Sequence, residues 1–290
     1  MPELPEVEVL VRRLAPLLKN KTVRAVEVRR RKVIAPASPR QFARALAGAK
    51  FLAVARRGKF LLFTLRRARA RPPLLLAGHL GMTGRMYLLP ARAPVPPHAA
   101  VVLWLGKTKF VYEDSRYFGR LSLDATAVRR LGPEPLGEEF TLADFSARLK
   151  RSAQPIKVRL LDQSLLAGVG NIYASEALFC ARVSPRARAK RLSAAQVGRL
   201  WRAIRAVLQE AIDFGSTVPL DWNGTGARDG LFYYGRAANA RGTDEERLRV
   251  YDRRGKPCLR CGTAIERIVQ SARSTFYCPR CQREGREESV

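Results

Sequence analysis

The first residues of the chain are suited to covalent chemistry. If Met1 is removed, Pro2 exposes a secondary amine with Glu3 beside it, and Glu6 follows one turn later. An α-amino group titrates near pH ~7.7–8.0, so part of it is unprotonated at neutral pH and can attack a sugar carbon to form an iminium. A neighbouring carboxylic acid can protonate the leaving group. The alternative is that Pro2 and Pro5 only begin a helix, because proline suits a first turn.

Four cysteines near the end of the chain have the spacing of a metal site. They form two Cys-x2-Cys pairs, Cys258 with Cys261 and Cys278 with Cys281. Four thiolates satisfy tetrahedral Zn²⁺ and leave no open position, which predicts one structural zinc ion that stabilises a short tail. A redox pair is the alternative, but two matched pairs would then be redundant. Cys180 stands among apolar residues, so we expect it in a core.

The composition points to a polyanionic partner. Lys and Arg number 54 against 25 Asp and Glu, giving a net charge of +29. An excess of this size favours nucleic acid, although solubility or an arginine-rich genome are alternatives. No continuous apolar stretch is long enough to cross a membrane. The first twenty residues are interrupted by charges and lack a signal-peptide core, so we expect a cytosolic protein.

The elements that must position these residues begin with a helix. Val7, Leu10, Leu14 and Leu17 are spaced as its buried stripe. Short apolar stretches separated by turn signals follow, and many short strands at such spacing predict a sandwich or barrel. The predicted strands are Thr22–Val28, Phe51–Ala55, Phe60–Leu65, Leu74–His79, Arg85–Leu89, Ala99–Leu105, Lys109–Glu113 and Arg120–Leu123.

The second half of the chain has helical patterns. Leu131–Gly137 contains the Pro and Gly residues of a linker. Thr141 is placed to cap a helix through Arg151, and Ser193 to cap one that runs to about Phe214. Gly215–Glu246 is long and has no clear period. The predicted domains are 1–130, a linker at 131–140, a helical domain at 141–247 and a zinc finger at 248–290.

One corner between helices is suited to binding phosphate. Gly168 and Gly170 permit a tight turn, and a helix that starts there presents unpaired N–H groups and a positive dipole end. Asn171 adds a side-chain donor, while Lys150 and Lys157 lie upstream and are candidates for contacts with a nucleic-acid backbone. The alternative is an ordinary corner between two helices, and such corners far outnumber those that bind DNA.

Four separated motifs resemble the formamidopyrimidine-DNA glycosylase family, and the resemblance covers nearly the whole chain. The motifs are PELPEVE at 2–8, HLGMTG at 79–84 with RYFG at 116–119, GVGNIYASE at 168–176, and the cysteine tail. The resemblance implies an α+β protein with an N-terminal helix plus a β-sandwich domain. An α-helical domain with a helix–two-turn–helix element and a C-terminal zinc finger would follow, and DNA would lie in the cleft between the domains.

The same resemblance implies catalytic roles. The mature N-terminal Pro2 would be the nucleophile and Glu3 the general acid, while Glu6 would orient this end of the helix. Lys59, in a turn between two strands, would transfer protons during β-elimination, although a lysine there is usually a solvated charge. Arg273, before the second cysteine pair, would grip a phosphate and take part in δ-elimination.

Other residues would hold the DNA. An enzyme that acts on a base inside a duplex must flip it out, at a cost of a few kcal/mol. By resemblance, Met82 and Phe118 are wedges that fill the hole, and Arg116 faces the estranged base. His98 matches a residue that contacts DNA. The family commonly has a second basic residue where this chain has Tyr117, which affects the expected preference for the opposite base.

The implied activity is that of a bifunctional DNA glycosylase and AP lyase. It would excise oxidised purines from double-stranded DNA in base excision repair, as a monomer in the bacterial cytoplasm, with zinc as its only cofactor. Endonuclease VIII-type specificity for oxidised pyrimidines is one alternative, and a non-catalytic binder of damaged DNA is another. Gly215–Glu246, which in relatives folds over the flipped base, is the weakest match.

Overall fold

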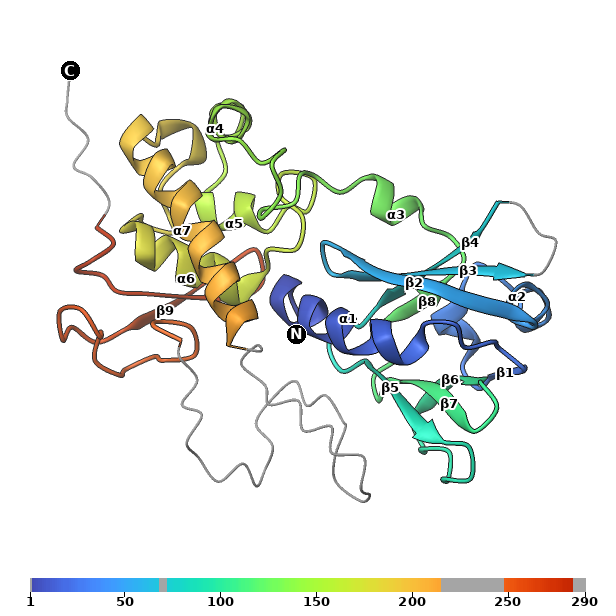
Figure 1. Ribbon diagram of the computed structural model, residues 1–290. Helices are drawn as coiled ribbons and strands as arrows, with labels where there is room; N and C mark the ends of the chain where they lie inside the picture. The colour runs from blue at the N-terminus through green and yellow to red at the C-terminus, as the bar shows by residue number, and fades with distance from the viewer. Residues whose placement is uncertain (1, 68–71, 215–247, 284–290) are drawn as a thin grey trace. The chain divides into compact units, whose positions relative to one another are not determined.

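The computed structural model describes residues 2–67, 72–214 and 248–283, which form two compact units (Figure 1). The first unit holds described residues 2–129, and the second holds 130–214 and 248–283. The predicted loop Gly215–Glu246 lies outside the described residues. Within the described part of the chain, no helix is long and apolar enough to span a membrane.

The first unit begins with helix α1 (Leu4–Leu18), which packs against the neighbouring strands β2 and β3. Leu10 and Leu14 are buried as predicted, but Leu17 is 37% exposed and Leu18 is buried in its place. A helix turns about 100° per residue, so position 18 falls roughly 20° from the direction of Val7, whereas position 17 falls roughly 80° away. The prediction for Leu17 was therefore wrong.

Two antiparallel sheets form the rest of the core. The first has the order β1 (Ala25–Val28), β6 (Ala99–Trp104), β7 (Thr108–Glu113), β5 (Arg85–Pro90). The second has the order β2 (Ala49–Arg57), β3 (Phe60–Arg67), β4 (Leu74–His79), β8 (Arg120–Ser122). Their inner faces share one core, in which the rings of Phe63 on β3 and Phe110 on β7 lie 5.6 Å apart in a T-shaped contact. The predicted β-sandwich is confirmed.

Three short elements complete the described part of the first unit: η1 (Arg31–Ile34), α2 (Pro39–Leu46) and α3 (Thr126–Arg129). The sequence patterns did not predict α2, although its start carries a capping box. Ser38 Oγ accepts the Gln41 N–H at 3.2 Å, and the Gln41 side chain accepts the Ser38 N–H at 2.9 Å. Buried Phe42 and Leu46 attach this helix to the main core.

The second unit is helical. Before the cysteine tail, its elements are α4 (Leu142–Lys150), α5 (Ile156–Leu160), α6 (Asn171–Ala181), η2 (Ala189–Arg191) and α7 (Ala194–Asp213). Both predicted caps are present, because Thr141 Oγ1 accepts the Asp144 N–H at 3.1 Å and Ser193 Oγ accepts the Gln196 N–H at 3.2 Å. Helices α6 and α7 pack against each other and form the centre of this unit.

The predicted linker is part of the helical unit. The Gly132 N–H donates to the Gln163 carbonyl at 2.8 Å, and the Ala167 N–H donates to the Pro133 carbonyl at 3.0 Å. The guanidinium of Arg205 on α7 donates to the Pro135 and Gly137 carbonyls. Proline and glycine prevent helix and strand in this segment, but the segment is still ordered. Neighbouring side chains and backbone groups form hydrogen bonds with its carbonyl groups.

The cysteine tail folds around a hairpin of two strands, β9 (Glu266–Gln270) and β10 (Arg273–Tyr277). Phe276 on this hairpin and Phe179 on α6 belong to the same buried cluster, together with Cys258 and Cys278. The tail is thus joined to the helical unit through a shared small core.

Candidate functional site

The turn that precedes α1 is fixed by a carboxylate. Glu3 is the N-cap residue, and Glu6 Oε2 accepts its backbone N–H at 2.8 Å as part of a capping box. Pro2 is buried, and Glu3 and Glu6 are only 1% and 3% exposed. This arrangement holds the peptide group directly after Pro2 in one place, which fits the orienting role expected for Glu6.

Lys59 sits in a two-residue turn that is tied to α1. The turn joins the paired residues Arg57 and Phe60, and Gly58 takes the positive φ of +56° that such turns need. Arg56 donates to Glu8 on α1 at 2.7 Å and to the Gly58 carbonyl at 3.4 Å. The lysine turn and the helix that starts after Pro2 are therefore connected through one guanidinium.

The carboxylate at the other end of this connection is Glu8. Burial alone would raise its pKa, but hydrogen bonds and charge from Arg56 and Arg12 outweigh burial and hold the pKa below its ordinary value. Glu8 is consequently ionised at neutral pH, and the connection between α1 and the turn is charged on both sides.

Met82 and Phe118 are exposed apolar side chains at the tips of two turns. Their exposed fractions are 41% and 50%, which is unusual for side chains of this size. The Arg116 guanidinium lies 4.8 Å from the centre of the Phe118 ring. All three residues expected to occupy and read an opened base pair thus lie in the two turns that join β4 to β5 and β7 to β8.

His79 closes one of these turns. Its Nδ1 accepts the Gly81 N–H at 3.1 Å, which requires the neutral ring. Burial, with smaller effects from the positive charges of Lys59 and Arg120, lowers the pKa of His79 to about 4. The ring is therefore neutral at pH 7, and it keeps the turn closed without adding charge near Lys59.

His98 is exposed at the end of the loop before β6. Its carbonyl accepts the Asp114 N–H at 3.1 Å, so the backbone of His98 is attached to the turn that carries Arg116 and Phe118. The residue whose imidazole is expected to contact DNA is therefore bonded to the start of the turn that carries Arg116 and Phe118.

In the second unit, the glycine corner has the predicted form. Gly168 has a φ of +84°, and α6 begins at Asn171 directly after Gly170. The Asn171 amide nitrogen donates to the Ser274 carbonyl at 2.8 Å. The corner is thereby bonded to β10 one residue beyond Arg273, and the two candidate phosphate-binding features form one surface element.

Lys157 differs from the expectation. Its side chain is fully buried, and Nζ donates to the Asn171 carbonyl at 3.0 Å and to Ser175 Oγ at 2.6 Å. The ammonium therefore supports the start of α6 from inside, and in this structure it is not presented to a phosphate. Lys150 is exposed at the end of α4, as a backbone contact requires.

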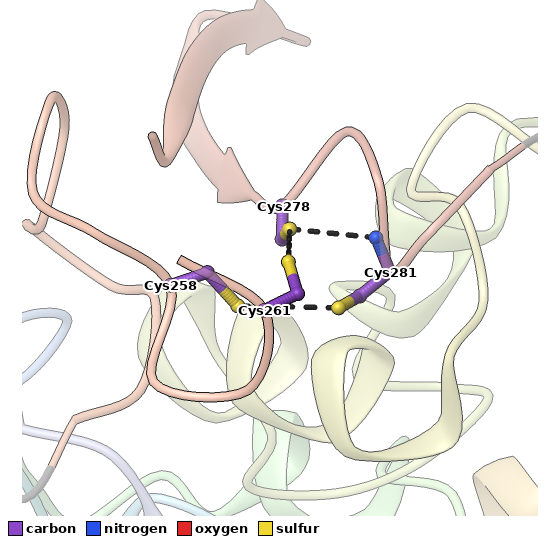
Figure 2. Close-up of side chains that lie close together, drawn as sticks. All are labelled: Cys258, Cys261, Cys278 and Cys281. Carbon is purple, nitrogen blue, oxygen red and sulfur yellow. Dashed lines mark hydrogen bonds between the residues drawn. The ribbon is translucent and has the colours of Figure 1, made fainter. Parts of the chain in front are cut away.

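The four cysteines meet as the zinc prediction requires (Figure 2). Their sulfur atoms all lie within 4.8 Å of one another, with Cys261 and Cys278 at 3.5 Å and Cys258 and Cys281 at 3.9 Å. Zn–S bonds of about 2.3 Å in a tetrahedron place sulfurs about 3.8 Å apart, so the set fits one structural zinc ion. The backbone N–H of Cys281 points at the Cys278 sulfur, at 3.4 Å.

Arg273 follows a strained turn. Ser271 and Ala272 link β9 to β10 with φ values of +47° and +58°, a region that favours glycine or asparagine. Other residues have a higher conformational energy at these φ values, so interactions with the surrounding structure must hold the turn in this conformation. Arg273 itself is exposed at the first position of β10.

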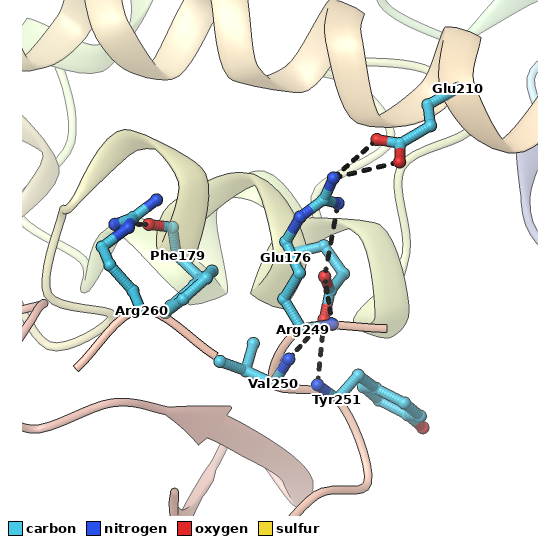
Figure 3. A network of polar contacts seen from close by, with 7 residues as sticks. All are labelled: Glu176, Phe179, Glu210, Arg249, Val250, Tyr251 and Arg260. Carbon is cyan, nitrogen blue, oxygen red and sulfur yellow. Dashed lines mark hydrogen bonds and ion pairs between the residues drawn. The ribbon is translucent and has the colours of Figure 1, made fainter. Parts of the chain in front are cut away.

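A network of polar contacts that the sequence patterns do not predict joins the helices to the tail (Figure 3). The Glu176 carboxylate on α6 accepts backbone N–H groups from Arg249, Val250 and Tyr251, each at 2.9 Å. The Arg249 guanidinium also donates to both oxygens of Glu210 on α7, at 3.0 and 2.8 Å. An acidic residue within the apolar run of α6 was the available signal.

Comparisons with known proteins cover the chain from end to end. Residues 1–121 match the formamidopyrimidine-DNA glycosylase N-terminal domain, 131–220 match the H2TH domain of the same protein, and 255–283 match a zinc finger found in FPG and IleRS. The formamidopyrimidine-DNA glycosylase of Herpetosiphon aurantiacus is 43% identical over 97% of this chain and 100% of its own. The chain belongs to the formamidopyrimidine-DNA glycosylase family.

Solved structures of the family agree over the same length. The Lactococcus lactis Fpg in complex with DNA containing an abasic site is 29% identical, with a TM-score of 0.84 over 97% of this chain and 100% of that one. MutM in complex with DNA containing carbocyclic 8-oxo-G is 30% identical, with a TM-score of 0.83 over 98% and 100%. The expected family, fold class and zinc finger are confirmed.

Proposed function

We propose that this chain is a bifunctional DNA glycosylase and AP lyase that excises oxidised purines, such as 8-oxoguanine and formamidopyrimidines, from double-stranded DNA. Membership of a family of base-excision repair glycosylases supports the reaction class. The related complexes with 8-oxo-G and abasic DNA support the substrate class. We further infer that it acts as a monomer in the bacterial cytoplasm, bound to the nucleoid through its positive charge.

The first half of the reaction uses the start of the chain. Once Met1 is removed, the Pro2 nitrogen forms a bond to C1′ of the damaged nucleotide, and the base leaves with the electrons of the glycosidic bond. Glu3 donates a proton to the sugar ring oxygen as the ring opens, which leaves an iminium between Pro2 and C1′. Glu6 holds the backbone of Glu3 in position for this step.

The second half is elimination from the iminium. The positive nitrogen acidifies C2′, which loses a proton, and the electrons expel the 3′ phosphate. Lys59 carries protons during this β-elimination, held by the turn that Arg56 ties to α1. A second elimination expels the 5′ phosphate, and Arg273 binds the phosphate that carries the departing charge.

The remaining residues hold the opened duplex. Met82 and Phe118 take the space of the flipped nucleotide, and Arg116 donates hydrogen bonds to the base left behind. Lys150 and Asn171 in the helical unit bind the DNA backbone, as does His98 in the loop before β6. Zinc, bound by the four cysteines, holds the hairpin of Arg273 in shape and supplies no chemistry to the reaction.

The observation that carries the proposal is the fixed turn at Glu3 and Glu6, directly after Pro2, in a chain that matches a glycosylase over 97% of its length. The test is incubation with a duplex that holds 8-oxoguanine opposite cytosine, in borohydride, which reduces an iminium to a stable adduct. We expect a covalent protein–DNA adduct. Pro2→Gly, or retention of Met1, should abolish it.

Pro5→Ala is the matched control, because it changes a proline of the same turn without touching the amine. It should keep the adduct. An adduct with oxidised pyrimidine but none with 8-oxoguanine would move the specificity to the endonuclease VIII type. Absence of an adduct with either base and with abasic DNA, after mass spectrometry has verified Met1 removal, would leave only a binder of damaged DNA.

A further inference from the structure

We propose that Asp114 is a positioning residue that locks the Met82 turn and the Phe118 turn into one rigid wedge. The two turns are far apart in sequence and follow different strands, β4 in one case and β7 in the other. Asp114 is the first residue of the second turn and is fully buried, and a carboxyl group is costly to bury unless hydrogen-bond partners surround it. Its role rests on the proposed function of Met82, Arg116 and Phe118.

Both carboxylate oxygens of Asp114 are used, and the donors come from both turns. Oδ1 accepts the Thr83 hydroxyl at 2.6 Å, one residue after Met82, and the Arg116 N–H at 3.1 Å. Oδ2 accepts the Gly119 N–H at 2.8 Å, one residue after Phe118. The donors therefore flank the wedge side chains directly, and a shift of either turn would break at least one of these bonds.

The backbones of the two turns also lie too close for side chains. Gly81 has a φ of +62°, and a Cβ placed on it would come within 2.6 Å of the Gly119 nitrogen. A Cβ on Gly119 would come within 1.9 Å of the Tyr112 hydroxyl and 2.5 Å of the His79 carbonyl. This close packing leaves the turns one relative position, and the Asp114 carboxylate satisfies the N–H groups that the packing removes from water.

A rigid wedge matters for one step of the reaction. Inserting Met82 and Phe118 must offset the loss of stacking and pairing when a damaged base leaves the helix. If the turns move independently, ordering them is an added cost at that step. An abasic nucleotide has no base to extract, so its cleavage depends much less on the wedge. The structure thus predicts that loss of Asp114 separates the two activities.

The test is Asp114→Asn, which keeps the shape but replaces one acceptor oxygen by an NH₂ group. If the NH₂ group points at the Gly119 N–H, two hydrogen-bond donors face each other and that hydrogen bond is lost. We expect single-turnover excision of 8-oxoguanine opposite cytosine to fall roughly 10-fold, as loss of one buried hydrogen bond predicts. Strand cleavage at a preformed abasic site should stay within about 2-fold, because the chemical step is intact.

The matched control is Asp124→Asn. Asp124 is exposed, and its carboxylate accepts the Thr126 N–H at 2.9 Å within its own turn, away from both wedge turns. It should change neither activity. Amide hydrogen exchange gives a readout that does not depend on catalysis: the Arg116 and Gly119 amides should exchange at least about 10-fold faster in Asp114→Asn, and not in Asp124→Asn.

Equal losses of excision and abasic-site cleavage in Asp114→Asn would overturn the inference, because they would show general damage to the fold. Unchanged exchange at both amides would overturn it as well. Failure of the proposed function gives a different result: Met82→Ala and Phe118→Ala would then leave excision unchanged, whatever Asp114→Asn does.

Discussion

The wedge turns and the Arg273 hairpin both present exposed side chains at tight turns, but different interactions hold them. The wedge turns, residues 79–84 and 114–119, are held by the buried Asp114 carboxylate and by close backbone contacts. The hairpin is held by four cysteines that fit zinc, a small shared core and a bond from Asn171. The first arrangement uses hydrogen bonds and close packing, and the second adds a metal.

The difference follows from the cores beneath them. The wedge turns extend from strands of a sandwich whose core includes residues from both sheets and α1. The hairpin rests on a cluster whose buried members include two of the cysteines themselves. A large core fixes the ends of its strands, so hydrogen bonds and packing are enough to hold the turns between them. A short tail has little core of its own and needs the binding free energy of a metal to stay folded.

Zinc removal should have the largest effect, because it should unfold the hairpin and leave the sandwich folded. Cys278→Ser, or treatment with a strong chelator, should unfold the hairpin and weaken binding to abasic-site DNA roughly 100-fold, since structural zinc contributes folding free energy outright. Melting of the sandwich should persist in calorimetry. Zinc per chain and binding by gel shift are the measurements. Cys180→Ser is the control and should keep its zinc; full zinc content in Cys278→Ser would contradict the assignment.

Lowering the pH should reduce the stability of the first unit, which carries the wedge turns. The pKa of His79 is lowered to about 4, below its ordinary value of 6.5, so the unfolded chain takes up the proton first. The stability that the neutral ring contributes is present above pH 6.5 and is lost as the pH falls from there to about 4. The slope is at most about 1.4 kcal/mol per pH unit for one proton.

The measurement is the free energy of unfolding between pH 7 and 5.5, a range above the ordinary pKa of 4.5 at which Glu8 in the unfolded chain begins to take up a proton. His79→Asn is the comparison, because its side-chain oxygen still accepts the Gly81 N–H and does not titrate. It should show a flatter curve over this range. Parallel curves for the two proteins would show that His79 does not contribute.

The smallest expected effect concerns strain in the hairpin. Ala272→Gly should stabilise the protein by about 0.5 kcal/mol, because glycine accepts the positive φ at lower cost than alanine. Ala264→Gly, at an exposed position of the same module without positive φ, should instead destabilise it by about 0.5–1 kcal/mol. Thermal melting of the zinc-bound proteins distinguishes the two; a loss in both would mean that the turn is not strained.

Much of the fold was predictable because its signals are local. The predicted strand Leu74–His79 matches β4 at both ends, and the predicted caps Thr141 and Ser193 begin α4 and α7. The cysteine spacing alone predicted the metal site, since the ligands of each pair are almost adjacent. Turn residues, caps and ligand pairs act over a few positions, so they can be recognised without knowing the tertiary structure.

What could not be predicted depends on partners that are distant in sequence. The sequence gives no signal for the role of Asp114, because its partner Thr83 is 31 residues away. Lys157 is predicted from the sequence to contact a nucleic-acid backbone, because only the fold places Ser175 and the start of α6 around its ammonium. A charged residue that a fold buries looks like any other charged residue in the sequence.

The order of segment 131–137 has a consequence for proteolysis and for the design of fragments. Proteases cleave segments that can unfold locally from the surrounding structure. This segment is hydrogen-bonded to Gln163 and Arg205. Limited proteolysis should therefore spare it, although its prolines and glycines give it the composition of an exposed connector. A fragment meant to hold the helical unit intact has to begin before Leu131, since one that starts at Thr141 would leave those carbonyl partners behind.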